Sequence, residues 1–231
     1  MPANELSSLL LAVMRGRKRT PADLLAQFAR DRTVRPTADD PRALLAVEAH
    51  AFAAAAAFTP VTLSPVAPLG LNVVLGDIDQ NSTLAALRNT EVLADPTTVL
   101  ALATALERPT DAVVKKCAAA RMLRMQPFDN PAFSPHFAIF ALTSGGRARA
   151  DHGFELEALL DHLTAHLELY ERLAADGYRI ADVRVEVADS ANDDARLAAV
   201  EARVFPSLRA RFPSVECAID RARTHAMQYY R

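Results

Sequence analysis

Tryptophan is absent from this chain of 231 residues, and aromatic residues make up only 6% of it. This shortage argues against an aromatic-rich β-sandwich. Hydrophobic residues nevertheless reach 51%, and much of that share is alanine, the strongest helix former. The composition therefore favours helices that pack through small residues, in one large domain or in one domain with a small extension.

Cysteine is limited to Cys117 and Cys217, which lie far apart and form no Cys-x-x-Cys motif. We interpret both as small buried hydrophobic residues in a reducing compartment. The apolar run nearest the N-terminus, Leu9–Met14, precedes the neighbouring basic residues, whereas a secretory signal has the reverse order. No uninterrupted apolar stretch reaches transmembrane length. The sequence therefore predicts a cytoplasmic protein that has no membrane partner.

An excess of basic charge is also lacking, since the net charge is -2 and the pI is near 6.3. This balance does not support nucleic acid as the main partner. A local cluster of Arg15, Arg17, Lys18 and Arg19 leaves a contact with RNA or phosphate open. The alternative for this cluster is a solvated helix end, where cations interact favourably with the helix dipole.

Proline follows a capping residue at Thr20–Pro21, Asp40–Pro41 and Asp95–Pro96, which predicts helix starts there. Apolar residues at helical spacing support these and further helices. The predicted helices cover residues 4–15, 21–30, 41–58, 96–108, 154–175 and 192–211, and Pro206 is predicted to kink the last one. The predicted strands cover residues 84–87, 116–126, 136–144, 183–187 and 215–219. Residues 61–76 contain Pro65 and Pro68 and are predicted to be extended and interrupted by turns.

This order of elements favours an α+β fold with a largely antiparallel sheet flanked by helices. We expect an N-terminal helical extension over residues 1–40 and a single α+β domain over residues 41–231. The strands at Lys116–Gln126 and His136–Ser144 are predicted to form a hairpin. Because both faces of the second strand are apolar, we expect it to be central and covered on both sides.

Three segments contain motif-like residues. They are LRNTEVLADPTTVLALA at Leu87–Ala103, the hairpin with Leu123-Arg124-Met125-Gln126 and His136-Phe137, and Asp220-Arg221-Ala222-Arg223 with Tyr229-Tyr230. A helix and an extended segment with Pro65 precede them. In this order they resemble the catalytic core of class II aminoacyl-tRNA synthetases, especially the histidyl type and its non-synthetase paralogues. The resemblance implies the class II fold.

The resemblance also implies a ligand-binding site made of Glu91, Arg124, Gln126, Phe137, Arg223 and Tyr229. In such a site Glu91 would face the substrate, Arg124 would clamp a phosphate with two donors, and Phe137 would help to hold ATP, the implied cofactor. Arg223 and Tyr229 would contact the substrate. The helix and extended segment at residues 41–76 would form a homodimer. The alternatives are a surface position for Arg124 and a core position for Phe137.

The chain departs from the family's pattern at several points. Gln126 stands where the family has glutamate, Arg223 and Tyr229 are farther apart than in the family, and a third motif is missing. We therefore expect a divergent class II synthetase-like protein that binds a nucleotide or an amino-acid-like small ligand without full synthetase activity. The alternative is a non-catalytic homodimeric structural or regulatory protein. No catalytic residue is assigned.

Two further features each have a functional and a structural interpretation. His162 and His166 lie four apart on a predicted helix, a spacing at which two imidazoles can share a metal, and a small enzyme built around them is a third hypothesis. A solvated helix face explains the same spacing, and we predict no metal ligand. The Ser144–Arg147 segment would be either a phosphate-binding turn or an ordinary Gly-Gly loop.

Overall fold

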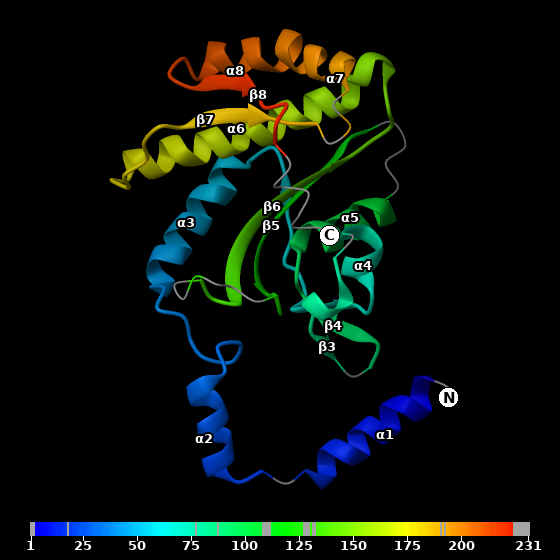
Figure 1. Ribbon diagram of the computed structural model, residues 1–231. Helices are drawn as coiled ribbons and strands as arrows, with labels where there is room; N and C mark the ends of the chain where they lie inside the picture. Colours follow the sequence, from blue (N-terminus) through cyan, green and yellow to red (C-terminus); the bar gives the residue numbers. More distant parts are fainter. Residues whose placement is uncertain are drawn as a thin grey trace. The chain divides into compact units, whose positions relative to one another are not determined.

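The computed structural model of the chain describes residues 3–17, 19–76, 78–86, 88–107, 112–126, 130, 133–189, 191 and 193–223. Helices and strands are mixed along the chain (Figure 1), which confirms the predicted α+β class. The chain divides into two units. The first unit comprises Met1–Ala38, Ser64–Asp95 and Arg121–Ile139, and the second unit comprises Asp39–Leu63, Pro96–Ala120 and Phe140–Arg231.

The first unit combines helices with a small antiparallel sheet. Its helical elements are α1 (Ala3–Gly16), α2 (Pro21–Arg30), α4 (Leu71–Gly76) and the 3-10 turn η1 (Gln80–Ser82). Its strands β2 (Val66–Pro68), β3 (Ala85–Ala86) and β4 (Thr90–Val92) pair in the order β2-β4-β3. Helix α2 begins where the sequence predicts, because the Thr20 hydroxyl accepts from the Asp23 N–H and the Asp23 carboxylate accepts from the Thr20 N–H.

One prediction fails in this unit. Residues 61–76 are not extended throughout, because Leu71–Gly76 forms α4. Gly70 has a φ of 84°, a left-handed conformation that glycine adopts without strain, and it turns the chain from β2 into the helix. Leu71 and Asn72 are buried in the first turn of α4. Tertiary burial of these two side chains thus fixes a helix in a short, β-branched segment whose local pattern favours a strand.

The second unit is the more helical of the two. Its helical elements are α3 (Pro41–Ala54), α5 (Pro96–Glu107), η2 (Ala150–His152), α6 (Gly153–Ala175), α7 (Asp194–Ala199), the π-helical η3 (Val200–Val204) and α8 (Phe205–Arg211). Its strands are β1 (Thr59–Pro60), β7 (Arg184–Val187) and β8 (Glu216–Ile219), and β7 pairs with β8 in parallel. The long strands β5 (Val114–Leu123) and β6 (His136–Gly145) have residues in both units.

The sheet that contains these long strands has the order β1-β5-β6. The middle strand in the described part of the sheet is therefore β5, and the prediction that the strand at His136–Ser144 is central is wrong. The Arg124 N–H donates to the Pro135 carbonyl at 2.8 Å, so the end of β5 meets the start of β6, as the predicted hairpin requires. Burial follows the order of the strands, since Cys117 and Ala118 of β5 are fully buried while most of β6 is half-buried.

The core of the second unit gathers around α6. This helix packs against α3 and also against η3 and α8 (Figure 1). Leu156 and Leu167 of α6 are buried with Val185 of β7 and with Phe205 and Leu208 of α8. Burial of each such side chain contributes about 1.5–3 kcal/mol to the stability of the folded state, so the apolar stripe of α6 stabilises the second unit strongly.

The ends of these helices follow from local chemistry. Helix α6 closes at Gly177, whose φ is 90°, with the Tyr178 N–H donating to the Leu173 carbonyl at 3.0 Å. Just before Pro206, which lacks an N–H, the helix predicted over residues 192–211 changes to the π-helical turn η3 between α7 and α8. In the part of the chain that the structure describes, no helix combines the length and hydropathy needed to cross a bilayer.

Candidate functional site

Arg124 follows directly after β5 in the first unit, and its side chain contacts neighbouring backbone. Its Nε–H donates to the Ala94 carbonyl at 3.0 Å, and its Nη2 lies 3.8 Å from Oδ2 of Asp95. The guanidinium carbon lies 5.2 Å from the centre of the Phe137 ring, a cation–π distance. The structure therefore brings together Arg124 and Phe137, two of the predicted site residues, and it also adds protein partners for the cation.

The charge of Arg124 is largely inside the protein. Its side chain is 11% exposed and the Asp95 side chain is 5% exposed. A buried pair of this kind costs desolvation energy, and removal of one partner leaves the other charge buried without compensation. Part of the donor capacity of Arg124 is thus used to attach the end of β5 to the Ala94–Asp95 backbone and side chain.

Glu91, on the middle strand of the small sheet, is completely buried. Its Oε1 accepts from the Asn72 N–H at 3.1 Å and from the Asn72 side-chain amide at 2.6 Å. Its Oε2 accepts from the Gly70 N–H at 3.0 Å and from the Gln80 side chain at 3.2 Å. Both carboxylate oxygens are therefore occupied by protein donors, and this carboxylate joins the start of α4 and η1 to β4.

These contacts decide the ionisation of Glu91. Burial works against the charged form, but the hydrogen bonds from Gly70, Asn72 and Gln80 outweigh it and hold the pKa of the carboxyl below its ordinary value. Glu91 is thus an anion inside the protein. A ligand would reach this anion by replacing one of its donors, and Gln80 is the exposed one among them.

The remaining predicted site residues are more scattered. Gln126 lies half-buried in the bend that follows Arg124. Arg223 belongs to the second unit, where its Nη1 lies 3.9 Å from Oε2 of Glu186. Tyr229 lies outside the described residues. Ligand binding by these residues, and by Glu91, Arg124 and Phe137, stays a prediction.

A pocket of about 270 Å³ surrounds Arg223 in the second unit. Apolar side chains of α6 and of the β7 region form part of its wall, and a few polar groups complete it. Its lining residues are Leu163, His166, Leu167, Tyr170, Val183, Arg184, Val185, Glu186 and Arg223. An apolar pocket with a few convergent polar groups is the usual form of a small-molecule site.

The polar groups of this pocket carry more positive than negative charge. Arg184 Nη2 lies 2.7 Å from Oε1 of Glu186, and Arg223 approaches the other carboxylate oxygen. Two guanidinium groups thus share one carboxylate. The His166 Nδ1–H donates to the His162 carbonyl at 2.7 Å, so Nε2 is the ring nitrogen left for a ligand. The pocket therefore offers two cations, one carboxylate and one imidazole.

His162 and His166 do not share a metal-like arrangement. Nε2 of His162 lies 2.9 Å from the Ser144 hydroxyl, whereas His166 uses Nδ1 for the backbone. Burial, followed by the charge of His166, lowers the pKa of His162, so its ring is neutral near pH 7. Across the described residues, no group of three or more His, Cys, Asp or Glu side chains is arranged to hold a metal ion.

The Gly-Gly turn after β6 is a place of close packing. A Cβ added at Gly146 would lie 2.7 Å from Cε2 of Phe154. Gly146 therefore has a steric role, since only a residue without a side chain lets the turn approach the ring of Phe154. This contact favours the structural interpretation of the Ser144–Arg147 segment.

Sequence reasoning assigned no role to Arg184, Glu186 or Tyr170. The signal for the first two is present, because the alternation Val-Arg-Val-Glu-Val places Arg184 and Glu186 on one face of β7. Tyr170 of α6 has the helical spacing of a core residue, but it is 39% exposed at the pocket. The approach of Arg223 to this face depends on tertiary structure, which a local pattern does not predict.

No protein-family model matches this chain, and no curated protein sequence matches it either. Among solved structures, it is similar to an ATP phosphoribosyltransferase regulatory subunit/histidyl-tRNA synthetase from Bacillus halodurans, with 14% identity, 58% of this chain covered and a TM-score of 0.43. It is also similar to histidyl-tRNA synthetase from Nostoc sp. PCC 7120, with 18% identity, 60% of this chain covered and a TM-score of 0.44.

A third similar structure is a pyrrolysyl-tRNA synthetase from Desulfitobacterium hafniense, with 18% identity, 67% of this chain covered and a TM-score of 0.43. The matches cover 36%, 34% and 51% of the three solved chains, which is less than two thirds of each. The neighbours are thus class II synthetases or proteins related to them. Identities and TM-scores this low assign no activity to the present chain.

Proposed function

We propose that this protein binds a small ligand of amino-acid size in the pocket between α6 and β7, and that it does not act as a full synthetase. The observation that carries the proposal is the set of Arg184, Glu186 and Arg223 at one pocket. An α-amino acid needs a cation for its carboxylate and an anion for its ammonium group, and this set offers both. Tyr170 and the neighbouring aliphatic residues provide a surface for its side chain.

Size separates the two ligand classes that the sequence predicts. Pockets for drug-sized ligands and nucleotides span roughly 300–1,000 Å³. The pocket of about 270 Å³ lies at the small end of this range, which suits an amino acid or a similar small zwitterion. The partners of Arg124 support the same choice, because the predicted phosphate clamp already contacts Ala94, Asp95 and Phe137.

The test is isothermal titration calorimetry on the full chain with the common amino acids, with simple carboxylates and with ATP. We expect Arg184→Ala to weaken amino-acid binding at least tenfold, since it removes one of two cations. Glu186→Gln is expected to weaken binding of amino acids more than binding of carboxylates, because a carboxylate has no ammonium group. Arg172→Ala, an exposed change on α6 outside the pocket lining, is the matched control and is expected to bind like the wild type.

Two outcomes would overturn this proposal. The first is an absence of binding heat and of any melting shift with every amino acid at millimolar concentration. The second is amino-acid-dependent exchange between ATP and pyrophosphate, which would show adenylation and restore a synthetase function. Equal loss of carboxylate and amino-acid binding in Glu186→Gln would keep the site but change the ligand class to a simple anion.

A second candidate, a homodimer formed through residues 41–76, is favoured by exposed apolar side chains in that range. Val73, Val74 and Leu75 of α4 are 40%, 80% and 49% exposed, and Leu45 of α3 is 67% exposed. Burial of such side chains against a second copy would remove apolar surface from water. Analytical ultracentrifugation of the wild type tests this candidate directly, and a monomer at 100 µM, roughly the scale of a weak dimer, would refute it.

A further inference from the structure

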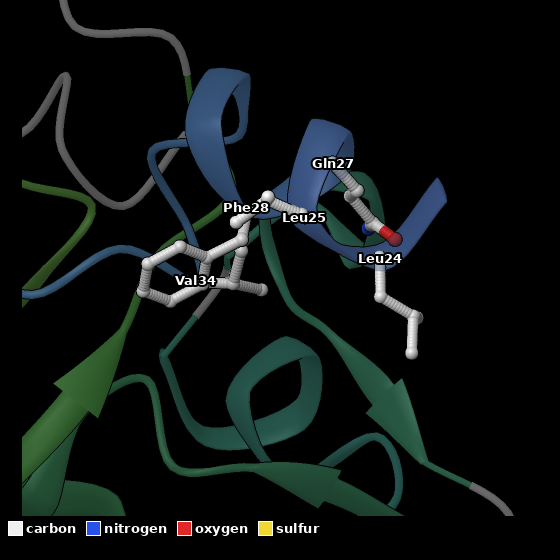
Figure 2. Close-up of a pocket in the computed structure, with 5 residues that line it drawn as sticks. All are labelled: Leu24, Leu25, Gln27, Phe28 and Val34. Carbon is white, nitrogen blue, oxygen red and sulfur yellow. The ribbon is translucent and has the colours of Figure 1, made fainter. Parts of the chain in front are cut away.

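The N-terminal arm, defined here as residues 3–38 of the first unit, displays an unusual amount of apolar surface. Nine of its large hydrophobic residues are between 42% and 69% exposed, and α2 contains no buried residue. The nine are Leu6, Leu9, Leu10, Val13, Met14, Leu24, Leu25, Phe28 and Val34. Leu24, Leu25, Gln27 and Phe28 of α2 line a hollow of about 460 Å³ together with Val34. Figure 2 shows these five side chains.

The C-terminal end of the arm is hydrogen-bonded to the rest of the first unit, although the apolar faces of its helices are exposed. The His136 Nε2–H donates to the Arg35 carbonyl at 2.6 Å, and the Arg32 guanidinium donates to the Phe133 carbonyl. These two contacts hold residues 32–35 beside the start of β6. Helices α1 and α2 are thus tethered to the first unit and still present apolar faces to solvent.

The area of this surface matches one side of a stable interface. Nine side chains that are about half exposed offer on the order of 800 Å² of apolar surface. A monomer's largest apolar patch is typically about 300–600 Å², whereas each partner in a standard interface buries about 800 Å². The arm therefore has the surface of a partner-binding element.

Charge indicates which surface the arm fits. Residues 1–38 hold seven of the 26 lysines and arginines but only three of the 28 acidic residues, so their net charge is +4 and that of the remainder is -6. Two arms paired only with each other would repel. The remainder of a second copy has a net negative charge, so long-range attraction favours an arm on the remainder of a second copy over an arm on another arm.

An apolar complement exists on the same chain outside the arm. Helix α4 exposes Val73, Val74 and Leu75, Leu69 beside it is 48% exposed, and the acidic Asp79 nearby is also exposed. We propose that two copies exchange arms, so that α1 and α2 of each copy cover the α4 face of the other. This proposal rests on the homodimer candidate stated above and is independent of the ligand pocket.

Sedimentation velocity on the full chain tests the exchange. We expect Leu25→Asp in the arm and Val74→Asp in α4 each to weaken the dimer more than tenfold, because both side chains are 69% or more exposed in one copy and buried in the dimer. Leu106→Asp is the matched control, since Leu106 of α5 is 83% exposed and lies outside both surfaces. Circular dichroism checks that each variant stays folded.

Mixing provides the sharpest readout. A Val74→Asp copy retains its arm and a Leu25→Asp copy retains its α4 face, so a mixed dimer contains one arm–face contact without a substitution. An equimolar mixture is therefore expected to dimerise more tightly than either variant alone. Attraction between the basic arm and the net negative charge of the rest of the second copy also predicts that the dimer weakens as salt rises from about 50 to about 500 mM.

Each alternative result has a clear meaning. A monomeric wild type would refute both the homodimer and the arm exchange. A dimer that survives Leu25→Asp but dissociates with Leu45→Asp or Val74→Asp would keep the homodimer and refute the exchange. A monomer that binds anionic phosphatidylserine vesicles, and loses this binding with Leu25→Asp, would assign the arm to a lipid surface and refute the proposal.

Discussion

Replacement of Glu91 by glutamine tests whether the buried carboxylate holds the first unit together. Each oxygen of Glu91 accepts two hydrogen bonds, from Asn72 on one side and from Gly70 and Gln80 on the other. The amide of glutamine turns one oxygen into an NH₂ group, so two donors lose their acceptor whichever way the amide is oriented. A buried donor without a partner costs roughly 1–3 kcal/mol.

We therefore expect Glu91→Gln to lower the free energy of unfolding by about 3 kcal/mol, near the low end for two such donors. For a chain of this size, that loss corresponds to a fall in Tm of roughly 6–12 °C. Urea and thermal unfolding followed by far-UV circular dichroism measure it, and the lack of tryptophan makes this probe more suitable than intrinsic fluorescence. Glu171→Gln, an exposed change on α6, is the matched control and is expected to shift stability by less than about 0.5 kcal/mol.

The lowered pKa of Glu91 also predicts how the stability difference between the wild type and Glu91→Gln changes with pH. Because the folded pKa of Glu91 lies below its ordinary value, its contribution is present above about pH 4.3, the usual pKa of a glutamate, and is lost as the pH falls through the folded pKa. The stability difference between the wild type and Glu91→Gln is thus expected to shrink on acidification. A variant within 0.5 kcal/mol of the wild type at pH 7, on the order of a surface change, would contradict a buried and fully hydrogen-bonded anion.

Two further predictions concern the second unit. Gly146→Ala places a Cβ against the ring of Phe154 and is expected to lower the free energy of unfolding by about 1–3 kcal/mol, measured by urea unfolding. Phe154→Leu in the same chain is expected to recover part of this loss. An unchanged stability of Gly146→Ala would contradict the close approach. His162 has a lowered pKa because of burial and the charge of His166, so stability is expected to fall as the pH drops below about 6.5, where the unfolded imidazole takes up a proton. His162→Gln should flatten this slope between pH 7 and pH 5, a range set by about one pH unit on either side of that pKa, and an unchanged slope would assign it to another group.

Much of the helical structure follows from sequence because its causes are local. Thr20–Pro21 and Asp40–Pro41 begin α2 and α3 as predicted, since a capping side chain and a proline within four residues set the geometry. Gly177 ends α6 for a similar reason. The wrong predictions have non-local causes. A strand with two apolar faces looks central, but β1 is only two residues long and pairs with β5, which moves the centre away from β6.

The candidate site also has a part with local causes, which the sequence predicts, and a part with non-local causes, which it does not. The resemblance draws attention to Glu91 and Arg124, but the partners that satisfy them, such as Gly70 and Ala94, lie 21 and 30 residues away and carry no local signal. A sequence therefore identifies a charge without telling whether the protein itself neutralises it. The closeness of Arg124 and Phe137 follows from the predicted hairpin, because the end of its first strand meets the start of its second.

This distinction separates structural charges from ligand-binding ones experimentally. Glu91 and Arg124 have several protein partners and are buried, so changes there are expected to reduce stability strongly. Arg184 and Arg223 are 63% and 41% exposed and share the single carboxylate of Glu186, so each has capacity for another anion and contributes little to folding. Changes at the pocket should therefore reduce ligand affinity while leaving Tm almost unchanged. If Arg184→Ala instead lowered Tm as much as Glu91→Gln, the pocket would be a structural ion-pair site, and the case for a ligand there would lose its physical basis.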